Sequence, residues 1–500
     1  FIWEGKVMIY PTLEEANLFV RDYSKIPIAY EVYADTETPI NLFLRFKENK
    51  SNCFLLESVN NEDQRGRYSF IGIDYELEVL IKDNQITLKK PDGEVEKRNG
   101  APIEAIKELM SINKAPRIKN MPKFSGGIVG YFAYDSVRYI EKKLSSPPKD
   151  DLNMPDGHFM LYNELIAFDH VKQKIVVIVN TKTQGDFTEN YNKAVDRAKE
   201  IAQEIRQSTL SIKPKCEEAS KREVIVKSNI TKEQYMQNVN RAKKHILDGD
   251  IFQIVLSQRF EIDNPPNAFD TYRILRVSNP SPYMYYFKFS EYEIVGSSPE
   301  KLVEVLENQV SIRPIAGTAK RGMDEKEDAH IENKLINDEK ERAEHTMLVD
   351  LGRNDIGKVC KMGSVHVTDF MRVEKYSKVM HIVSDVNGVL REDKSSLDAL
   401  AAVLPAGTLS GAPKVKAMEL IDEIEDVKRG LYGGTVGYIS FHEDMDTCIA
   451  IRTILFKNSK AYIQAGAGIV ADSNPAKEYE ETENKAKAMI NAIMEARDLG

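Results

Sequence analysis

The stretch ERAEHTMLVDLGRND, residues 341–355, places two acidic residues directly before an apolar segment. Glu341 and Glu344 are three residues apart, so in a helix their side chains share one face. Like charges at this spacing repel, and carboxylates beside an apolar surface are costly unless something compensates them. The stretch therefore predicts a helix whose acidic face needs a positive charge nearby.

A second segment, AGAGIVADSNPAKEYEETENKAKAMINAIMEA (residues 465–496), repeats this pattern. Asn474 and Pro475 are typical of a helix start. Glu478 and Glu481 are again three residues apart. If the two helices converge, four carboxylates meet, and hard oxygen ligands of this kind suit Mg²⁺.

Each acidic pair taken alone is also explained by a solvated helix face. Gly466 and Gly468, just before the second pair, favour a site because exposed backbone N–H groups can hold an anion. The apolar residues after the first pair favour it as well. The pairs by themselves leave both interpretations open.

The composition excludes several classes of protein. The net charge of −9 over 500 residues argues against nonspecific nucleic-acid binding. No window approaches the roughly 18 consecutive apolar residues of a membrane span, and the N-terminus FIWEGKVMIY lacks the pattern of a secretory signal. The cysteines are scattered without a CxxC pair, which makes disulfides and a zinc site unexpected; they are Cys53, Cys216, Cys360 and Cys448. We expect a cytoplasmic protein without a nucleic-acid or membrane partner.

The chain mixes predicted strands and helices. Strands are expected within residues 53–82 and at residues 174–180, and a helix at residues 186–207. The polar stretch 208–229 is the best candidate for a linker. It divides the chain into an N-terminal part, residues 1–215, and a C-terminal part, residues 225–500.

The start of the C-terminal part has a clear local signature. Thr231 and Gln234 form a capping-box pattern at the start of a predicted helix, which ends at Gly249. Residues 251–262 then have the pattern of a strand.

Nine motifs in the C-terminal part resemble the chorismate-binding enzymes, and among these the anthranilate synthase component I family. They are GDIFQIVLSQRF (249–260), NPSPYMYYF (279–287), VGSSPEKLV (295–303), RPIAGTAKRG (313–322), ERAEHTMLVDLGRNDIGKV (341–359), LPAGTLSGAPK (404–414), YGGTVGYI (432–439), IRT (451–453) and AGAGIVADSNPAKEYEETENKA (465–486). The N-terminal part adds LLES (55–58), GRYSFIG (66–72) and GGIVGYFAYD (126–135). The resemblance implies an α+β fold, with two large sheets and flanking helices around a central cleft. It makes residues 225–500 the chorismate-binding catalytic domain and the N-terminal part regulatory or structural.

The resemblance also implies that a magnesium ion compensates the negative charge of the two acidic helix faces. Glu344 and Glu481 match the family's magnesium ligands, with Glu341 and Glu478 beside them, and the ion would hold the ring carboxylate of chorismate. Arg452 matches the residue that pairs with the enolpyruvyl carboxylate, a task that suits an arginine fork. The other positions that match substrate contacts are Gly317, Thr318, Tyr432, Gly466, Ala467, Gly468 and Lys485.

Two residues match positions near the reacting ring. His381 lies among apolar residues, where a histidine is usually structural, but its match in the family lies near the departing C4 hydroxyl. Thr408 matches a threonine of the same region. In the family reaction ammonia adds at C2 as the hydroxyl leaves, and loss of the C2 proton and the enolpyruvyl group gives anthranilate and pyruvate. This is the first committed step of tryptophan biosynthesis.

Two positions discriminate between family members. Gln253 replaces the lysine that activates water in isochorismate and salicylate synthases, and a glutamine has no basic lone pair. Ala316 replaces the nucleophilic lysine of typical aminodeoxychorismate synthases. Both indicate ammonia as the nucleophile. The alternatives are an aminodeoxychorismate synthase component I without the lysine, and a regulatory protein that binds chorismate without turnover.

Ammonia in this family comes from a glutaminase with a Gly-x-Cys-x-Gly turn, and no cysteine here has such neighbours. The resemblance therefore implies a separate glutamine amidotransferase subunit, component II, in a heterotetramer, unless free ammonia is used.

The resemblance also implies feedback inhibition by tryptophan. In the family, the segments matching LLES and NPSPYM meet and bind the inhibitor away from the active site. Glu57 or another carboxylate is expected to receive the ammonium group of tryptophan and Arg67 its carboxylate, while Met284 offers an adaptable apolar wall. The other matching positions are Ser58, Pro282, Tyr283, Val436, Gly437 and Tyr438.

Overall fold

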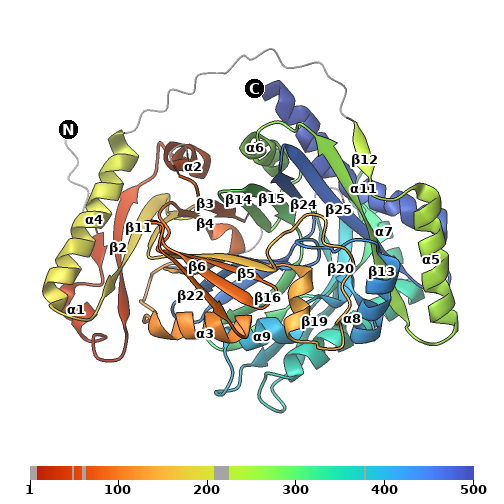
Figure 1. The fold of residues 1–500 in the computed structure, drawn as a ribbon, viewed down its shortest axis with the longest axis horizontal. Coiled ribbons are helices and arrows are strands. Elements are labelled where there is room, and N and C mark those ends of the chain that lie inside the picture. The colour runs from red at the N-terminus through yellow and green to blue at the C-terminus, as the bar shows by residue number, and fades with distance from the viewer. Residues whose placement is uncertain (1–7, 48–49, 59–63, 208–224, 377–378, 500) are drawn as a thin grey trace.

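The computed structural model describes residues 8–47, 50–58, 64–207, 225–376 and 379–499. Its strands form two large antiparallel sheets, and helices pack against their outer faces (Figure 1). The predicted α+β fold with two sheets and flanking helices is confirmed.

The first sheet has 13 strands. In spatial order these are β1 (Met8–Tyr10), β2 (Lys25–Tyr33), β11 (Lys174–Lys182), β10 (Glu164–Asp169), β4 (Tyr68–Gly72), β3 (Cys53–Glu57), β14 (Tyr283–Lys288), β15 (Tyr292–Ser298), β24 (Thr453–Lys457), β25 (Lys460–Ile469), β13 (Gln253–Asp263) and β12 (Val226–Ser228), with β21 (Gly411–Ala412) also paired to β13.

The second sheet has 12 strands. Their order is β18 (Ile315–Lys320), β20 (Val379–Val389), β17 (Gln309–Ile312), β16 (Lys301–Leu306), β23 (Met445–Ile449), β22 (Thr435–Ser440), β8 (Gly127–Phe132), β9 (Gly157–Tyr162), β5 (Leu77–Lys82), β6 (Gln85–Lys89) and β7 (Val95–Asn99), with β19 (His366–Lys375) paired to β20.

The helices pack outside the sheets. The α-helices are α1 (Leu13–Asn17), α2 (Pro39–Lys47), α3 (Pro102–Ile112), α4 (Phe187–Gln207), α5 (Lys232–Leu247), α6 (Ala268–Ser278), α7 (Glu325–Asn337), α8 (Glu339–Gly357), α9 (Ser396–Val403), α10 (Lys414–Ile424) and α11 (Pro475–Ala496). Short 3-10 helices are η1 (Gln64–Arg67), η2 (Tyr134–Tyr139), η3 (Gly407–Leu409) and η4 (Arg497–Leu499). α2, α4, α6 and α11 pack on the first sheet, and α3, α8 and α9 on the second.

The sheets also pack against each other. Their shared core contains Phe54 and Tyr285 from the first sheet and Val129, Tyr131 and Val436 from the second. Large aromatic side chains bury much apolar area, so this layer contributes strongly to stability.

Both sheets draw strands from both halves of the chain. β3 pairs with β14 in the first sheet, and β8 pairs with β22 in the second. The boundary expected near residues 215–225 therefore divides the chain but not the layers. The expected linker 208–229 also differs from the structure, because Val226–Ser228 is strand β12, exposed at the sheet edge. Residues 208–224 lie outside the described residues.

The predicted helix starts are confirmed. Thr231 and Gln234 form the reciprocal capping box of α5. The side chain of Asn474 accepts hydrogen bonds from the backbone N–H groups of Ala476 and Lys477 at the start of α11. The acidic stretch that opens with Glu341 lies in α8, which Asp338 caps.

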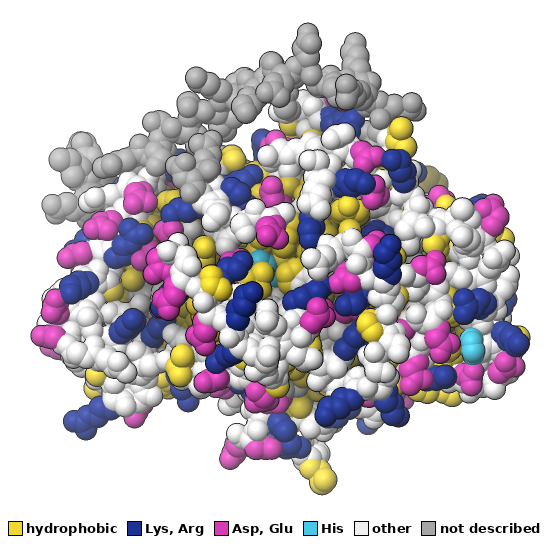
Figure 2. Space-filling model, viewed as in Figure 1, with side chains coloured by type: hydrophobic (Ala, Val, Ile, Leu, Met, Phe, Trp, Pro, Cys, Tyr) yellow, Lys and Arg dark blue, Asp and Glu magenta, His cyan; other side chains and the backbone are white. Residues whose placement is uncertain are grey.

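The face of the molecule drawn in Figure 2 has mixed charge. Basic and acidic side chains are interspersed over the face drawn in Figure 2, with hydrophobic side chains between them near its centre. Such a face differs from the basic stripe typical of nucleic-acid binding. Among the described helices, none combines the length and apolar character that a membrane crossing requires.

Candidate active site

The two acidic helices lie within electrostatic reach of each other. Burial and the charges of Glu344 and Glu481 raise the pKa of Glu341. Burial and the charge of Glu481 likewise raise the pKa of Glu478. Because Glu341 and Glu344 belong to α8 and the other two to α11, carboxylates from both helices act on one another.

One lysine supplies part of the compensating charge. Lys485 Nζ lies 2.6 Å from Glu481 Oε1 and donates a hydrogen bond to the carbonyl of Gly466 at 2.9 Å. Among the described residues, the only further lysine of this kind beside the other three carboxylates is Lys340. Lys340 already forms an ion pair with Asp472. A divalent cation between the helices would relieve the repulsion that raises the pKa of Glu341.

The carboxylates are not gathered into a closed ligand shell. Within the part of the chain that the structure describes, no three His, Cys, Asp or Glu side chains lie close enough to hold a metal ion by themselves. The donor chemistry fits magnesium, which commonly keeps several of its own waters and uses few protein ligands.

Gln253 connects the acidic face of α8 with the glycine-bearing strand. Its side chain is buried at the start of β13, and Nε2 donates to Glu344 Oε1 at 3.1 Å. A Cβ added to Gly468 would lie 3.0 Å from the same Nε2. The amide oxygen of Gln253 is buried and has no hydrogen-bond partner among the described residues. It can therefore accept a hydrogen bond from a small nucleophile such as ammonia.

Thr318 and His381 meet across the β18–β20 pair. His381 Nδ1 lies 3.0 Å from Thr318 Oγ1 and 3.2 Å from the carbonyl of Gly317. Because a carbonyl only accepts hydrogen bonds, we assign the proton to Nδ1, which leaves Nε2 as an acceptor. Burial lowers the pKa of His381, against the hydrogen bond to Gly317, and the charge of Arg452 adds to the decrease. The lowered pKa favours the neutral imidazole, whose Nε2 is free to accept a proton.

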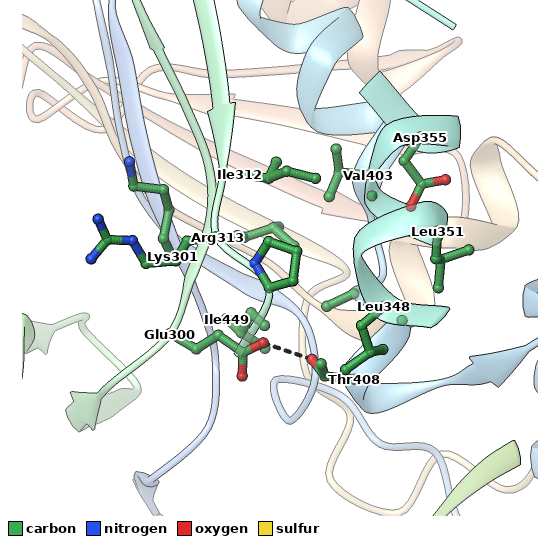
Figure 3. Close-up of a pocket in the computed structure, with 15 residues that line it drawn as sticks. Glu300, Lys301, Ile312, Arg313, Leu348, Leu351, Asp355, Val403, Thr408 and Ile449 are labelled. Carbon is green, nitrogen blue, oxygen red and sulfur yellow. Dashed lines mark hydrogen bonds between the residues drawn. The ribbon is translucent and has the colours of Figure 1, made fainter. Parts of the chain in front are cut away.

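A protonatable carboxyl that the sequence analysis missed lies in a neighbouring pocket. Glu300 Oε1 accepts a hydrogen bond from Thr408 Oγ1 at 2.9 Å. Figure 3 shows these two side chains pointing toward each other, with Ile449 beside Glu300 and Leu348 beside Thr408. Burial raises the pKa of Glu300 to about 7, although the Thr408 hydrogen bond and the charge of Lys485 oppose the increase.

Glu300 is therefore partly protonated near neutral pH, as suits an acid or base catalyst. Its only sequence signal is its place in the motif VGSSPEKLV (295–303). The apolar neighbours that raise its pKa come from distant parts of the chain.

Two of the expected substrate contacts, Arg452 and Tyr432, are buried near α11 and β25. Arg452 Nη1 donates to the carbonyl of Lys485 at 2.6 Å, and burial lowers its pKa, against the nearby Glu481 charge. Tyr432 is buried, and its hydroxyl lies 2.7 Å from where a Cβ on Gly466 would be. Any larger residue than glycine at position 466 would displace this tyrosine.

These contacts join residues from distant elements into one site. Gln253, Glu344 and Gly468 form one group, while Tyr432, Gly466, Lys485, Arg452 and Glu481 form the next. Ala467 lies between the two glycines on β25, opposite Leu256 of β13. The charge of Lys485 reaches Glu300, and that of Arg452 reaches His381.

Comparison with known proteins identifies the family of the chain. A family model described as chorismate binding enzyme matches residues 51–491. The chain belongs to the chorismate-binding enzymes. Anthranilate synthase component 1 of Acetivibrio thermocellus is 52% identical over 495 residues, covering 98% of this chain and all of that protein. The protein of that name from Pseudomonas aeruginosa is 46% identical, covering 96% of this chain and 98% of its own length.

A solved structure gives the same result for the fold of this chorismate-binding enzyme. Anthranilate synthase component I from Streptococcus pneumoniae TIGR4 aligns with a TM-score of 0.75 and 38% identity, over 92% of this chain and 98% of the solved chain. The family and enzyme class predicted from the sequence are thereby confirmed.

The segments expected to form an inhibitor site lie side by side in this chorismate-binding enzyme. β3 and β14 pair with Glu57 opposite Met284, which is buried. Ser58 Oγ is buried and has no hydrogen-bond partner in the part of the chain that the structure describes, so it can bind a ligand. Pro282 immediately precedes β14 and is half-buried.

Tyr283 packs on the core shared with the neighbouring sheet, whereas Met284 packs in the core between the first sheet and its helices. The Tyr283 hydroxyl donates to Asp446 Oδ1 of β23 at 2.9 Å. Val436, Gly437 and Tyr438 lie on the adjacent β22, and Tyr438 packs edge-on against Phe70 of β4 with ring centroids 6.0 Å apart.

Two expected charge roles differ from what the structure shows. Glu57 is buried and accepts hydrogen bonds from the Tyr272 hydroxyl at 2.5 Å and from Arg276 Nε at 2.8 Å, so an ammonium group would compete with α6 for it. Arg67 forms an ion pair with Asp169 at 2.8 Å, so its charge is already compensated. Both partners are far away in sequence, which is why spacing did not reveal them.

Proposed function

We propose that this chain is the large subunit of an anthranilate synthase, which converts chorismate and ammonia to anthranilate and pyruvate. The observation that carries the proposal is the environment of Gln253, whose amide nitrogen donates to Glu344 while its buried oxygen has no partner. A neutral acceptor can hold ammonia by one N–H and leave the lone pair free to attack. Ala316 at β18 offers no nucleophile that would compete with it.

The carboxylates of chorismate have two candidate partners. Arg452 would pair with the enolpyruvyl carboxylate. Glu344 and Glu481, with Glu341 and Glu478 beside them, would hold Mg²⁺. When bound, this ion supplies Lewis acidity and a counter-charge for the ring carboxylate. Gly317, Thr318, Tyr432 and the backbone of residues 466–468 would shape the rest of the pocket.

Two groups divide the proton transfers. Glu300, protonated in part near pH 7, donates a proton to the departing C4 hydroxyl, and Thr408 orients its carboxyl. The neutral His381 accepts the C2 proton at Nε2 when the ring becomes aromatic. This assignment reverses the donor role expected for His381, because its pKa is lowered and that of Glu300 is raised.

The ammonia is supplied by a separate glutamine amidotransferase subunit, component II, in a heterotetramer. The component number in the names of the relatives supports a partner chain. The described cysteines make poor nucleophiles, since burial raises the pKa of Cys53 to about 12 and that of Cys360 to about 11. Cys216 lies outside the described residues.

The site formed by β3 and β14 is proposed to bind tryptophan as a feedback inhibitor. The unpartnered hydroxyl of Ser58 and the apolar wall of Met284 support this role. The enzyme is expected to work in the cytoplasm.

Product identification tests the proposed activity. The purified chain is incubated with chorismate, MgCl₂ and ammonium at raised pH, where more free NH₃ is present. We expect fluorescent anthranilate, and chromatographic detection of aminodeoxychorismate or isochorismate instead would refute the proposal. The same chain with glutamine should form no anthranilate until a component II subunit is added. Glutamine-driven product from the isolated chain would contradict the two-chain arrangement.

A further inference from the structure

Arg429 carries a positive charge in the interior beside the candidate active site. It follows α10, and its side chain is 1% exposed. Nε and Nη2 donate to the two carboxylate oxygens of Glu425 at 2.9 and 2.6 Å. Desolvating such a pair offsets much of its attraction, so the pair by itself adds little stability. Its other contacts point to a different role.

The guanidinium joins two backbone segments that carry candidate site residues. Nη1 donates to the carbonyl of Leu409 at 2.6 Å, and Leu409 directly follows Thr408. Nη2 donates to the carbonyl of Val255 at 2.7 Å, two residues beyond Gln253 on β13. The Arg429 side chain thus connects β13 to η3, the turn that contains Thr408 and is called the Thr408 turn below.

The same guanidinium lies over the ring of Tyr432, a candidate substrate contact. Its carbon is 5.7 Å from the ring centroid of Tyr432 and 4.7 Å from that of Tyr134. A cation at these distances is attracted to the ring face. The Tyr432 hydroxyl in turn lies against Gly466, where a Cβ would come within 2.7 Å of it.

Glu425 makes a second contact to β13, at Ser257. Its Oε1 accepts hydrogen bonds from the backbone N–H and the hydroxyl of Ser257, at 2.8 and 2.9 Å. Ser257 lies opposite Gly466 on β25 and also accepts a hydrogen bond from Gln464 Nε2 at 2.9 Å. The Arg429–Glu425 pair thereby touches the segments that carry Gln253, Thr408 and Tyr432, and it is linked to Gly466 through Ser257.

We propose that Arg429 is a positioning residue that sets the affinity for chorismate by holding Tyr432, the Thr408 turn and β13 in register. This rests on the proposed function only in taking chorismate as the substrate. A lysine keeps the charge but lacks the planar fork, so it cannot hold both carbonyls and Glu425 at once.

The test compares Arg429→Lys and Arg429→Met with Arg45→Met. Arg45 is a matched control because it also pairs with a glutamate, Glu37, and donates to a backbone carbonyl, that of Ile205, yet touches no candidate site residue. Steady-state assays with chorismate, ammonium and Mg²⁺ are combined with thermal unfolding. We expect both Arg429 variants to raise KM for chorismate at least tenfold. Arg45→Met should keep KM within twofold even where Tm falls.

A KM within twofold of the unmodified value in folded Arg429→Lys would overturn the proposal, because a loss of folded protein lowers apparent kcat but leaves KM unchanged. If both Arg429 variants fail to fold, Ser257→Ala is the milder test, since it removes one hydroxyl donor to Glu425. There we expect a two- to fivefold rise in KM, and no change would overturn the proposal.

Hydrogen exchange separates this proposal from the proposed function. Mass spectrometry of Arg429→Lys should show at least tenfold faster amide exchange at residues 406–411 and 253–257, with no change there in Arg45→Met. This result stands even if the unmodified chain makes no anthranilate. Unchanged exchange in both segments would overturn the positioning role.

Discussion

Gln253 Nε2 donates a hydrogen bond to Glu344 Oε1 at 3.1 Å and so ties the start of β13 to the acidic face of α8. The residue proposed to choose the nucleophile is thereby in contact with a residue proposed to hold magnesium. Changing either one is expected to affect the environment of the other.

Replacing Gln253 by lysine is expected to change the nucleophile. An ammonium group beside Glu344 would form an ion pair, and in its neutral form would act as a base toward water. We expect Gln253→Lys to lower anthranilate formation at least tenfold and to yield isochorismate, identified by chromatography. Gln253→Met is the control, which should lose activity without the new product. Unchanged anthranilate formation by Gln253→Lys would contradict the role of this residue.

Glu344→Gln and Glu481→Gln should each lower kcat/KM at least 100-fold. The variants remove one negative charge from a set that raises the pKa of Glu341, so Tm should stay the same or rise slightly. Isothermal titration should show weaker Mg²⁺ binding in the presence of chorismate. Glu480→Gln, at the exposed position before Glu481 on α11, is the matched control and should keep full activity. Full activity of Glu344→Gln or Glu481→Gln would contradict the proposal that these residues bind magnesium.

The rate should fall as the pH rises through about 7, the pKa to which burial raises Glu300. A proposed acid must be protonated, so kcat at saturating free NH₃ decreases above this pKa. Thr408→Val removes a hydrogen bond that lowers the pKa of Glu300, so the falling limb should move to higher pH. If the falling limb of the pH profile does not move in Thr408→Val, that limb belongs to a group other than Glu300.

Glu300 should also affect how the stability of the folded protein depends on pH. Its pKa in the folded protein exceeds the ordinary value of 4.5, so the folded state binds the proton more tightly than the unfolded state. Glu300 therefore costs stability above its unfolded pKa, and this cost develops as pH rises from about 4.5 to about 7. Glu300→Gln should lower kcat by about 10²–10⁴-fold. Thermal unfolding should show that it raises Tm more at pH 8 than at pH 5, and an equal change at both would argue against the raised pKa.

Ser58→Ala and Met284→Thr should leave turnover within twofold while raising the tryptophan concentration for half-inhibition at least tenfold. The Ser58 hydroxyl is buried without a partner among the described residues, and Met284 is buried opposite the adjacent Glu57, so each change removes one feature of the proposed inhibitor site. Calorimetry should show the matching loss of tryptophan affinity. By linkage, chorismate must weaken tryptophan binding by the factor with which tryptophan weakens chorismate binding. Failure of millimolar tryptophan to inhibit the unmodified chain would mean that this site does not regulate the enzyme.

Local features were predictable because their interactions connect residues close in sequence. Thr231 and Gln234 cap α5 from three residues apart, and Asn474 caps α11 from two and three residues away. The spacing of Glu341 and Glu344 indicated one helix face before the position of α11 was known. The family motifs extended these local predictions to the fold and to the candidate site residues.

The tertiary structure decided what depends on distant partners. Glu300 has a raised pKa because burial in the pocket excludes water from its carboxyl, and the hydroxyl of Thr408, 108 residues away, only partly opposes this increase. Arg67 pairs with Asp169 across 102 residues, and Glu57 is held by Arg276 across 219. The sequence by itself determined the helix caps, the acidic faces and the family. Burial and charge compensation were decided only by the tertiary structure, because both depend on which remote side chains exclude water from a group.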